Sequence, residues 1–233
     1  MQHNICCVIG VGPGNGAALA RRFAAEGYRV ALVARDAKAL AGFERDIPGS
    51  TAFPADITDA AAVERLFVDI RQQLGPVSVL LYNAGGGAFK SAEDAAPEEF
   101  EAAWRVNALG LFLAARAALP QLREAGGGSL LVTGAGAALR GRPRTAPFAA
   151  AKAAQRSLAQ SLARQLGPEG IHVAYVLIDG VVDLPRTRQA LPDKPDDFFL
   201  NPDHIAETVY HMTRQPRSAW TFELDLRPYG EAW

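Results

Sequence analysis

The stretch "VIGVGPGNGAALARRFAAEG", residues 8–27, leads from a short apolar run into a helical segment through four glycines in seven residues. A backbone approaches a pyrophosphate closely only where side chains are absent, and the first turn of the following helix offers free N–H groups. The alternative is a tight turn needed only for packing, but one turn does not require four glycines. The pattern therefore predicts a dinucleotide site at this strand–helix junction, formed by Gly10, Gly12, Pro13, Gly14, Asn15 and Gly16.

Outward from this junction, β-rich runs alternate with helical segments. Several runs are continuously apolar, as expected for strands that helices cover on both faces. We therefore expect one Rossmann-type α/β domain over residues 1–233, with a doubly wound parallel sheet of about seven strands and helices on both faces. The expected strands are 5–10, 29–34, 51–56, 77–82, 129–134, 171–178 and 220–226, and the expected helices are 15–26, 37–45, 59–74, 97–124, 148–166 and 203–213.

One stretch, residues 181–202, shows no regular pattern. It contains four prolines and mixed charge. A loop of this length in a compact domain is usually a lid or a disordered segment, so we expect a substrate loop here.

Composition excludes several classes of protein. With 24 basic and 25 acidic residues the net charge is -1, so no basic field indicates nucleic acid and no cluster of Lys and Arg indicates a membrane surface. We identify no metal site, and no apolar run approaches transmembrane length.

Cys6 and Cys7 are adjacent on a predicted strand and should face opposite sides, as two reduced, buried side chains of a cytoplasmic protein. His172 and His204 are expected to be peripheral.

The end of the second expected strand bears on cofactor choice. An acidic residue about twenty positions past the glycines would bind the ribose hydroxyls of NAD(H). The first residue beyond the strand is Arg35, followed by Asp36. A guanidinium favours a 2′-phosphate, so we expect NADP(H) over NAD(H). A shift of one residue would reverse this preference, and Arg35 is alternatively a solvated charge at a strand end.

From Cys6 to about Gly180 the sequence resembles the short-chain dehydrogenase/reductase family. Its glycine pattern matches Gly10, Gly14 and Gly16, and its adenine-contacting pair matches Asp56 and Ile57. The family's Asn-Ala-Gly matches Asn83, Ala84 and Gly85, its helix asparagine matches Asn107, and its active-site lysine matches Lys152. The resemblance implies that the first of these groups lines a nicotinamide dinucleotide, that Lys152 binds the nicotinamide ribose, and that Asn107 holds a water in a proton relay.

The departures from the family pattern concern the chemistry. The serine that polarises the substrate carbonyl should lie thirteen residues before the tyrosine that moves the proton. These positions are Ala135 and Phe148, and the usual Pro-Gly after the sixth strand is Asp179–Gly180. Neither Ala135 nor Phe148 can donate a proton, and losing a positioned general acid lowers rates by about 10²–10⁴-fold. Lys152 and Gly180 remain candidates for cofactor binding, whereas Asn107 is alternatively a helix amide that satisfies local backbone groups.

Asp179 is the candidate for a displaced acid. It follows a strand near the expected position of the nicotinamide, where an apolar pocket would favour its protonated form. The alternative is a carboxylate that pairs with Arg140, Arg142 or Arg186. Tyr82 carries a phenol but is expected to pack in the sheet. Arg140, Arg142 and Arg144 form either a receptor for an anionic substrate or a solvated loop.

Three functions remain open at this point. The first is an NADP(H)-dependent oxidoreductase for a small carbonyl or alcohol, with Asn107, Lys152 and Asp179 as candidate catalytic residues. The second is a catalytically silent dinucleotide-binding sensor or partner subunit. The third is an elimination or isomerisation that needs no tyrosine. The resemblance also implies a homodimer or homotetramer, because helix 148–166 and the helix that contains Asn107 form subunit faces in the family.

Overall fold

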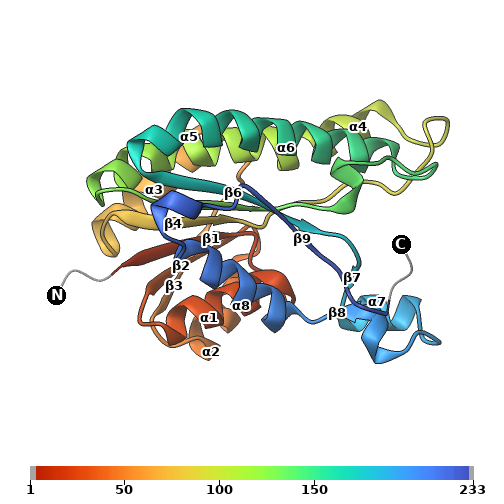
Figure 1. Cartoon of the computed structure of the whole chain (residues 1–233), viewed down its shortest axis with the longest axis horizontal. Coiled ribbons are helices and arrows are strands. Elements are labelled where there is room, and N and C mark those ends of the chain that lie inside the picture. The colour runs from red at the N-terminus through yellow and green to blue at the C-terminus, as the bar shows by residue number, and fades with distance from the viewer. Residues whose placement is uncertain (1–3, 231–233) are drawn as a thin grey trace.

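The protein, described here by a computed structural model over residues 4–230, has three layers in which helices cover both faces of a sheet (Figure 1). Among the described residues, the sheet has seven parallel strands in the order β3-β2-β1-β4-β5-β6-β9. The doubly wound parallel sheet expected from the sequence is thus confirmed. The strands are β1 (Ile5–Ile9), β2 (Arg29–Ala34), β3 (Ser50–Pro54), β4 (Val77–Tyr82), β5 (Gly128–Thr133), β6 (Ile171–Ile178) and β9 (Glu223–Leu226).

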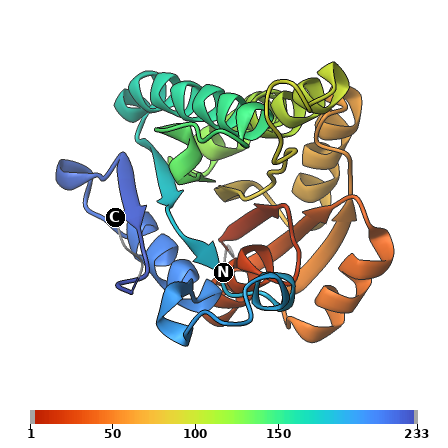
Figure 2. The same ribbon diagram turned by 90° about the vertical axis from the view of Figure 1, so that its right-hand side faces the viewer.

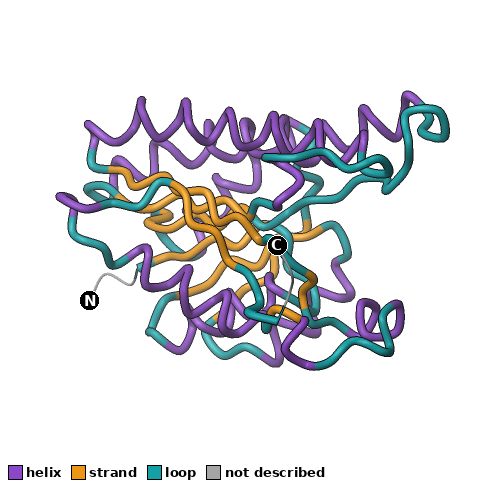
Figure 3. Tube along the Cα trace, turned by 45° about the vertical axis from the view of Figure 1, so that its right-hand side comes forward, coloured by secondary structure: helices purple, strands orange, loops and turns teal. Residues whose placement is uncertain are grey.

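One apolar core lies on each face of the sheet. Cys7 packs in one core and Cys6 in the other, so the two side chains face opposite sides, as predicted. Figure 2 shows the two helical layers above and below the strands, and Figure 3 shows the loops that join helices and strands at the ends of the sheet. One layer contains α1 (Asn15–Ala25), α2 (Ala37–Asp46) and α8 (Pro202–Thr213). The other contains α3 (Ala60–Gln73), α5 (Gly110–Glu124) and α6 (Ala146–Leu166).

The strand order reverses between β1 and β4, and this reversal fixes where a ligand binds. From β1 the chain adds β2 and β3 on one side of the sheet and then returns to add β4 on the other side of β1. This change in strand order opens a crevice at the carboxyl ends of β1 and β4. The glycine-rich junction after β1 lies at this switch point. The fold therefore brings the predicted nucleotide site to the usual ligand crevice of an open α/β sheet.

The expected helix over 97–124 is one continuous helical run with an irregular centre. It consists of α4 (Pro97–Trp104), the π-helical segment η1 (Arg105–Leu109) and α5. Single π-helical turns inside α-helices are frequent at functional sites. Asn107 lies in this turn.

Residues 181–202, for which the sequence indicated no regular structure, contain short helices and strands, and their role as a substrate loop stays a prediction. They contain β7 (Val181–Val182), α7 (Pro185–Ala190) and β8 (Phe199–Leu200), and β7 pairs with β8 in parallel. Arg188 donates to Asp183 at 2.7 Å and to Asp196 at 2.6 Å. The strand pairing and these ion pairs within the segment order a stretch whose sequence has no periodicity. The segment lies at the right-hand end of the molecule in Figure 1.

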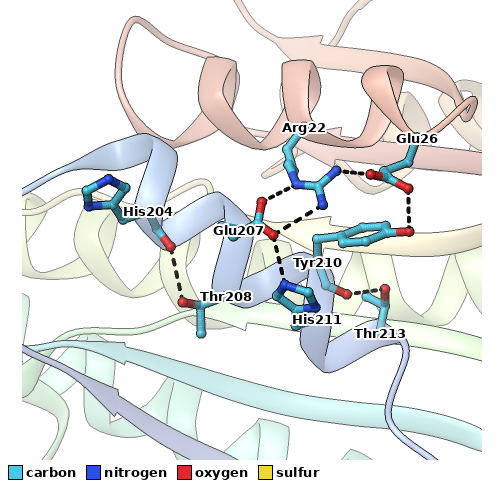
Figure 4. Close-up of polar contacts among 8 residues, drawn as sticks. All are labelled: Arg22, Glu26, His204, Glu207, Thr208, Tyr210, His211 and Thr213. Carbon is cyan, nitrogen blue, oxygen red and sulfur yellow. Dashed lines mark hydrogen bonds and ion pairs between the residues drawn. The ribbon is translucent and has the colours of Figure 1, made fainter.

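The C-terminal helix α8 is fastened to α1 by a polar network (Figure 4). Arg22 binds Glu207 and Glu26, and its guanidinium lies over the Tyr210 ring, 4.1 Å from the centroid. The Tyr210 hydroxyl donates to Glu26 at 2.8 Å. The helix α8 is therefore joined to α1 in the same helical layer.

His172 is not peripheral, in contrast to the sequence expectation. It lies in β6, is buried, and stacks on Trp220 with ring centroids 4.8 Å apart. Burial lowers the pKa of His172 below its ordinary value. The side chain helps to join β6 to the segment before β9, a role that only the fold reveals. His204 lies at the exposed start of α8. Within residues 4–230, the helices are all too short or too polar to cross a membrane.

Candidate active site

A cleft of about 1890 Å³ runs along the carboxyl ends of the strands. It is lined by residues from both halves of the sheet, and it includes every cofactor-binding candidate named from the sequence. It also includes Lys152 and Asp179, and the positions Ala135 and Phe148. Asn107 is not part of its lining but lies directly behind it.

The glycine-rich loop has no room for side chains at two of its positions. A Cβ on Gly10 would lie 2.4 Å from the Ala84 nitrogen, and Gly10 has φ +93°, a conformation that side-chain-bearing residues rarely adopt. A Cβ on Gly16 would lie 2.4 Å from the Gly10 oxygen. The Asn83 amide donates to the Gly10 oxygen at 2.8 Å and ties the loop to β4. The loop is thus built for close backbone approach, and Asn83 supports it.

The start of α1 is open to an anion. Its N-cap, Gly14, provides no side-chain hydrogen bond, and in the first turn the Ala17 nitrogen donates to the Gly12 oxygen at 3.0 Å. No heavy atom lies within 4 Å of the Cβ position of Gly12. These features fit a pyrophosphate seated on the helix N-terminus. The Asn15 Oδ1 atom is buried and has no hydrogen-bond partner among residues 4–230, so it can accept from a hydroxyl group.

The end of β2 separates the two residues that bear on cofactor choice. The Asp36 side chain accepts a hydrogen bond from the Ala39 nitrogen at 3.0 Å and caps α2. Arg35 is exposed and lines the cleft. The carboxylate is therefore engaged in the helix cap, whereas Arg35 borders the cleft.

Asp56 and Ile57 form the far wall of this end of the cleft. The Asp56 carboxylate accepts from the Thr58 nitrogen at 2.9 Å and from its hydroxyl at 2.8 Å. The hydrogen bond from the Thr58 backbone is the main cause that lowers the pKa of Asp56, with a contribution from nearby Arg35. Ile57 is buried. The pair presents a fixed anionic rim and an apolar surface, which suits an adenine ring.

The Asn107 side-chain amide binds two backbone carbonyl groups, one in its own helical run and one in the loop after β4. In the π-helical turn the amide donates to the Ala103 oxygen at 2.8 Å and to the Gly86 oxygen at 2.6 Å. Its main-chain oxygen accepts from the Gln155 amide at 3.2 Å, so that oxygen is already occupied by protein. This arrangement agrees with the alternative in which Asn107 satisfies local backbone groups, and the proton-relay role stays a prediction.

Lys152 is buried without a carboxylate partner among the described residues. Its ammonium donates to the Thr133 oxygen and to the Gln155 Oε1 atom, both at 3.0 Å. Burial lowers the pKa of Lys152 to about 7, because desolvation disfavours the charged form. The Gln155 amide thus bridges Lys152 and the main chain of Asn107. Sequence reasoning missed Gln155, although its spacing of three residues from Lys152 places it on the same helix face.

The positions of the family's serine and tyrosine form an apolar wall beside Lys152. Phe148 lies one helical turn before Lys152, with its ring centroid 6.0 Å from the Lys152 Nζ atom. The buried phenols of Tyr82 and Tyr175 do not line the cleft. Tyr82 donates to the Val106 oxygen at 2.5 Å, and burial raises the pKa of both phenols. Tyr82 packs in the sheet, as expected.

Asp179 has two guanidinium partners. Its carboxylate lies 2.6 Å from Arg140 and 2.7 Å from Arg227, and it packs so tightly on Gly136 that a Cβ there would lie 1.8 Å from the Asp179 Oδ1 atom. These two ion pairs support the alternative interpretation, in which Asp179 pairs with Arg140, over a role as the displaced acid. Sequence reasoning missed Arg227 because it lies just past β9, far along the chain.

Comparisons with known proteins agree with this geometry. A family model described as short chain dehydrogenase matches residues 4–194. The oxidoreductase asL5 of Sarocladium schorii is 31% identical over 193 residues, which cover 82% of this chain and 77% of that protein.

Two similar solved structures contain a nicotinamide dinucleotide phosphate. An alcohol dehydrogenase from the archaeon Thermococcus sibiricus, complexed with 5-hydroxy-NADP, superposes with a TM-score of 0.87 at 27% identity and covers 99% of this chain and 98% of its own. A metagenomic short-chain oxidoreductase in complex with NADP gives a TM-score of 0.83 at 26% identity and covers 97% of each chain. With its strand order, glycine-rich junction and matched sequence, the chain belongs to the short-chain dehydrogenase family.

Proposed function

We propose that the protein is an NADP(H)-dependent oxidoreductase that acts on a small carbonyl compound or alcohol without a protein phenol as its acid. The cofactor preference rests on the different positions of the two residues that follow β2. Asp36 is engaged as the cap of α2, and Arg35 remains beside the cleft. A guanidinium binds a phosphate through paired hydrogen bonds, which the ribose hydroxyl of NAD(H) does not offer. The NADP-containing relatives support the same choice.

The residues present fit the whole dinucleotide. The start of α1, which has no side-chain cap, suits the pyrophosphate, and the space above Gly12 leaves room for it. The unpartnered Asn15 Oδ1 atom is an acceptor and suits a hydroxyl group of the dinucleotide. Asp56 and Ile57 suit the adenine, and Lys152 suits the nicotinamide ribose. When bound, the cofactor supplies or accepts the hydride.

The residues of the chain contribute mainly by binding and positioning. Lys152 is held by Thr133 and Gln155, so its donor directions are fixed before any ligand arrives. Ala135 and Phe148 carry no polar side-chain atom and donate nothing to the carbonyl oxygen. In the direction of reduction, the carbonyl carbon would gain the hydride and water would have to supply the proton to the oxygen. We therefore infer that substrates are carbonyl compounds that are reactive enough to need little polarisation by the protein.

The proposal is tested in two steps. Fluorescence titration should show tighter binding of NADPH than of NADH, because only NADPH carries the 2′-phosphate. Oxidation of NADPH should then follow when activated aldehydes and 1,2-diketones are added. Equal affinity for the two cofactors would contradict the preference. Tight NADPH binding with no oxidation across such a panel would instead indicate a silent dinucleotide-binding protein.

A further inference from the structure

The end of the cleft beyond Lys152 has an exposed aromatic floor. Phe89 is 63% exposed, and its ring centroid lies 4.9 Å from that of Phe148. Both residues line the cleft, together with Ala102, Ala103 and Ala135. A large exposed apolar surface inside a cleft is typical of ligand sites. An apolar or aromatic substrate body would cover these two rings.

The charges at this end do not balance. Glu99 lines the cleft, but Lys90 binds its carboxylate at 2.7 Å. Asp179 is paired with Arg140 and Arg227. Arg142 also lines the cleft, and no ion pair or side-chain hydrogen bond engages its guanidinium within residues 4–230. The acids at this end are thus neutralised by partners, and one cation is left without a counter-ion.

The loop that carries Arg142 is fixed to the helix that carries Phe148. The Arg142 nitrogen donates to the Thr145 hydroxyl at 2.8 Å, and that hydroxyl donates back to the Arg142 oxygen at 2.9 Å. Thr145 is the N-cap of α6, three residues before Phe148. On the opposite side, the Ala146 nitrogen donates to the Lys90 oxygen at 3.2 Å. The cation and the aromatic floor therefore belong to one local unit.

Arg186 also lines the cleft but is assigned to the cofactor end. It lies in α7, two residues after Leu184, whose Cδ2 atom lies 2.6 Å from the Cβ position of Gly14. That contact places this segment over the glycine-rich loop. Arg142, by contrast, is held through its main chain by Thr145, the N-cap of the helix that carries Phe148.

We propose that Arg142 binds the carboxylate of an anionic carbonyl substrate whose apolar body lies on Phe89 and Phe148. This inference rests on the proposed oxidoreductase function and specifies its substrate class. An ion pair at the rim of an apolar cleft strengthens binding of the acid, whereas a neutral ester of the same shape gains only the apolar contact. The preferred substrates are then keto acids or aldehyde acids with an aromatic or alkyl body.

The test separates binding from turnover. Calorimetry with the NADP⁺-saturated protein measures benzoate against methyl benzoate, so that the cofactor fills its own anion sites. Turnover compares 4-formylbenzoate with its methyl ester. Arg142→Gln should weaken benzoate binding about 10-fold or more, as expected for a charge-assisted hydrogen bond, and should bring the acid-to-ester turnover ratio toward one. Arg144→Gln is the matched control, since Arg144 is exposed on the same loop but does not line the cleft.

The possible outcomes distinguish this inference from the proposed function. Benzoate binding that depends on Arg142, without reduction of either aldehyde, would support the anion site and contradict the oxidoreductase. Reduction of acid and ester with equal efficiency, unchanged in Arg142→Gln, would support the oxidoreductase and overturn the anion site. Equal losses in Arg142→Gln and Arg144→Gln would indicate general surface charge, and absence of benzoate binding to the wild type would also overturn the inference.

Discussion

The two ends of the cleft differ in how their polar groups are used. At the nucleotide end, backbone N–H groups, Arg35 and the Asn15 Oδ1 atom are left for a ligand. At the substrate end, Asp179 and Glu99 are already paired with protein cations, and Ala135 and Phe148 carry no polar side-chain atoms. Lys152 lies between the two ends. At the proposed nucleotide end polar groups remain for a ligand, whereas the wall beside Phe148 has, within residues 4–230, a single charged side chain without an ion pair, Arg142.

The largest expected effect comes from restoring donors to the substrate end. The double variant Ala135→Ser and Phe148→Tyr would place a hydroxyl and a phenol beside Lys152, whose nearby ammonium stabilises a phenolate. We expect carbonyl reduction to become about 10²–10⁴-fold faster, the usual contribution of a positioned acid. Steady-state NADPH oxidation measures it. Ala135→Ser alone, which lacks the acid, is the control. An unchanged rate in the double variant would mean that the substrate carbonyl does not receive its proton at positions 135 and 148.

The next largest effect is on cofactor binding at the nucleotide end of the cleft. Arg35→Gln removes the guanidinium but leaves Asp36 as the cap of α2. We expect NADPH affinity to fall about 10- to 100-fold, the equivalent of about 1.4–2.7 kcal/mol, with little change for NADH. Fluorescence titration with both cofactors gives the ratio. Lys38→Gln, an exposed change in the first turn of α2 outside the cleft lining, is the control. A parallel loss for both cofactors would contradict a specific contact to the 2′-phosphate.

Asp179→Asn tests whether this residue belongs to the structure or to the chemistry. The carboxylate is 11% exposed and joins Arg140 to Arg227, so its neutralisation should lower the free energy of unfolding by about 1–2 kcal/mol, reduced by the exposure of Arg140. Chemical denaturation measures this change. Asp225→Asn leaves Arg227 paired with Asp179 and should change stability by less than about 0.5 kcal/mol. A loss of turnover in Asp179→Asn at unchanged stability would indicate that Asp179 is the proton donor.

The smallest effect is a pH dependence that Lys152 imposes on stability. Its pKa is about 7 in the folded protein and about 10.4 in an unfolded chain, so the unfolded state binds more protons between these values. The free energy of unfolding should therefore rise by about 1 kcal/mol from pH 7 to pH 8, relative to Lys152→Met. Gln155→Glu would place a carboxylate beside the ammonium, raise the pKa of Lys152 and move this window upward. Identical pH profiles for wild type and Lys152→Met would contradict a depressed pKa.

Much of the fold followed from local rules. Apolar runs five to eight residues long, separated by helical segments, predicted the strands to within a few residues, because backbone geometry and burial on both faces leave their mark on each segment separately. The short elements within residues 181–202 were not predicted. Their order depends on the pairing of β7 with β8 and on the ion pairs of Arg188, and none of these contacts has a sequence period.

For the candidate site, the same division holds residue by residue. Residue type and spacing along a few turns were enough to predict the glycine-rich junction, the position of Lys152 and the absence of donors at Ala135 and Phe148. The caps, ion pairs and bridges came from packing: Asp36 caps a helix, Asp179 binds Arg227, and Gln155 joins Lys152 to Asn107. Hydrogen bonds and ion pairs act over a few ångströms, and the distance between residues far apart in the chain is fixed only when the whole sheet and its helices have packed.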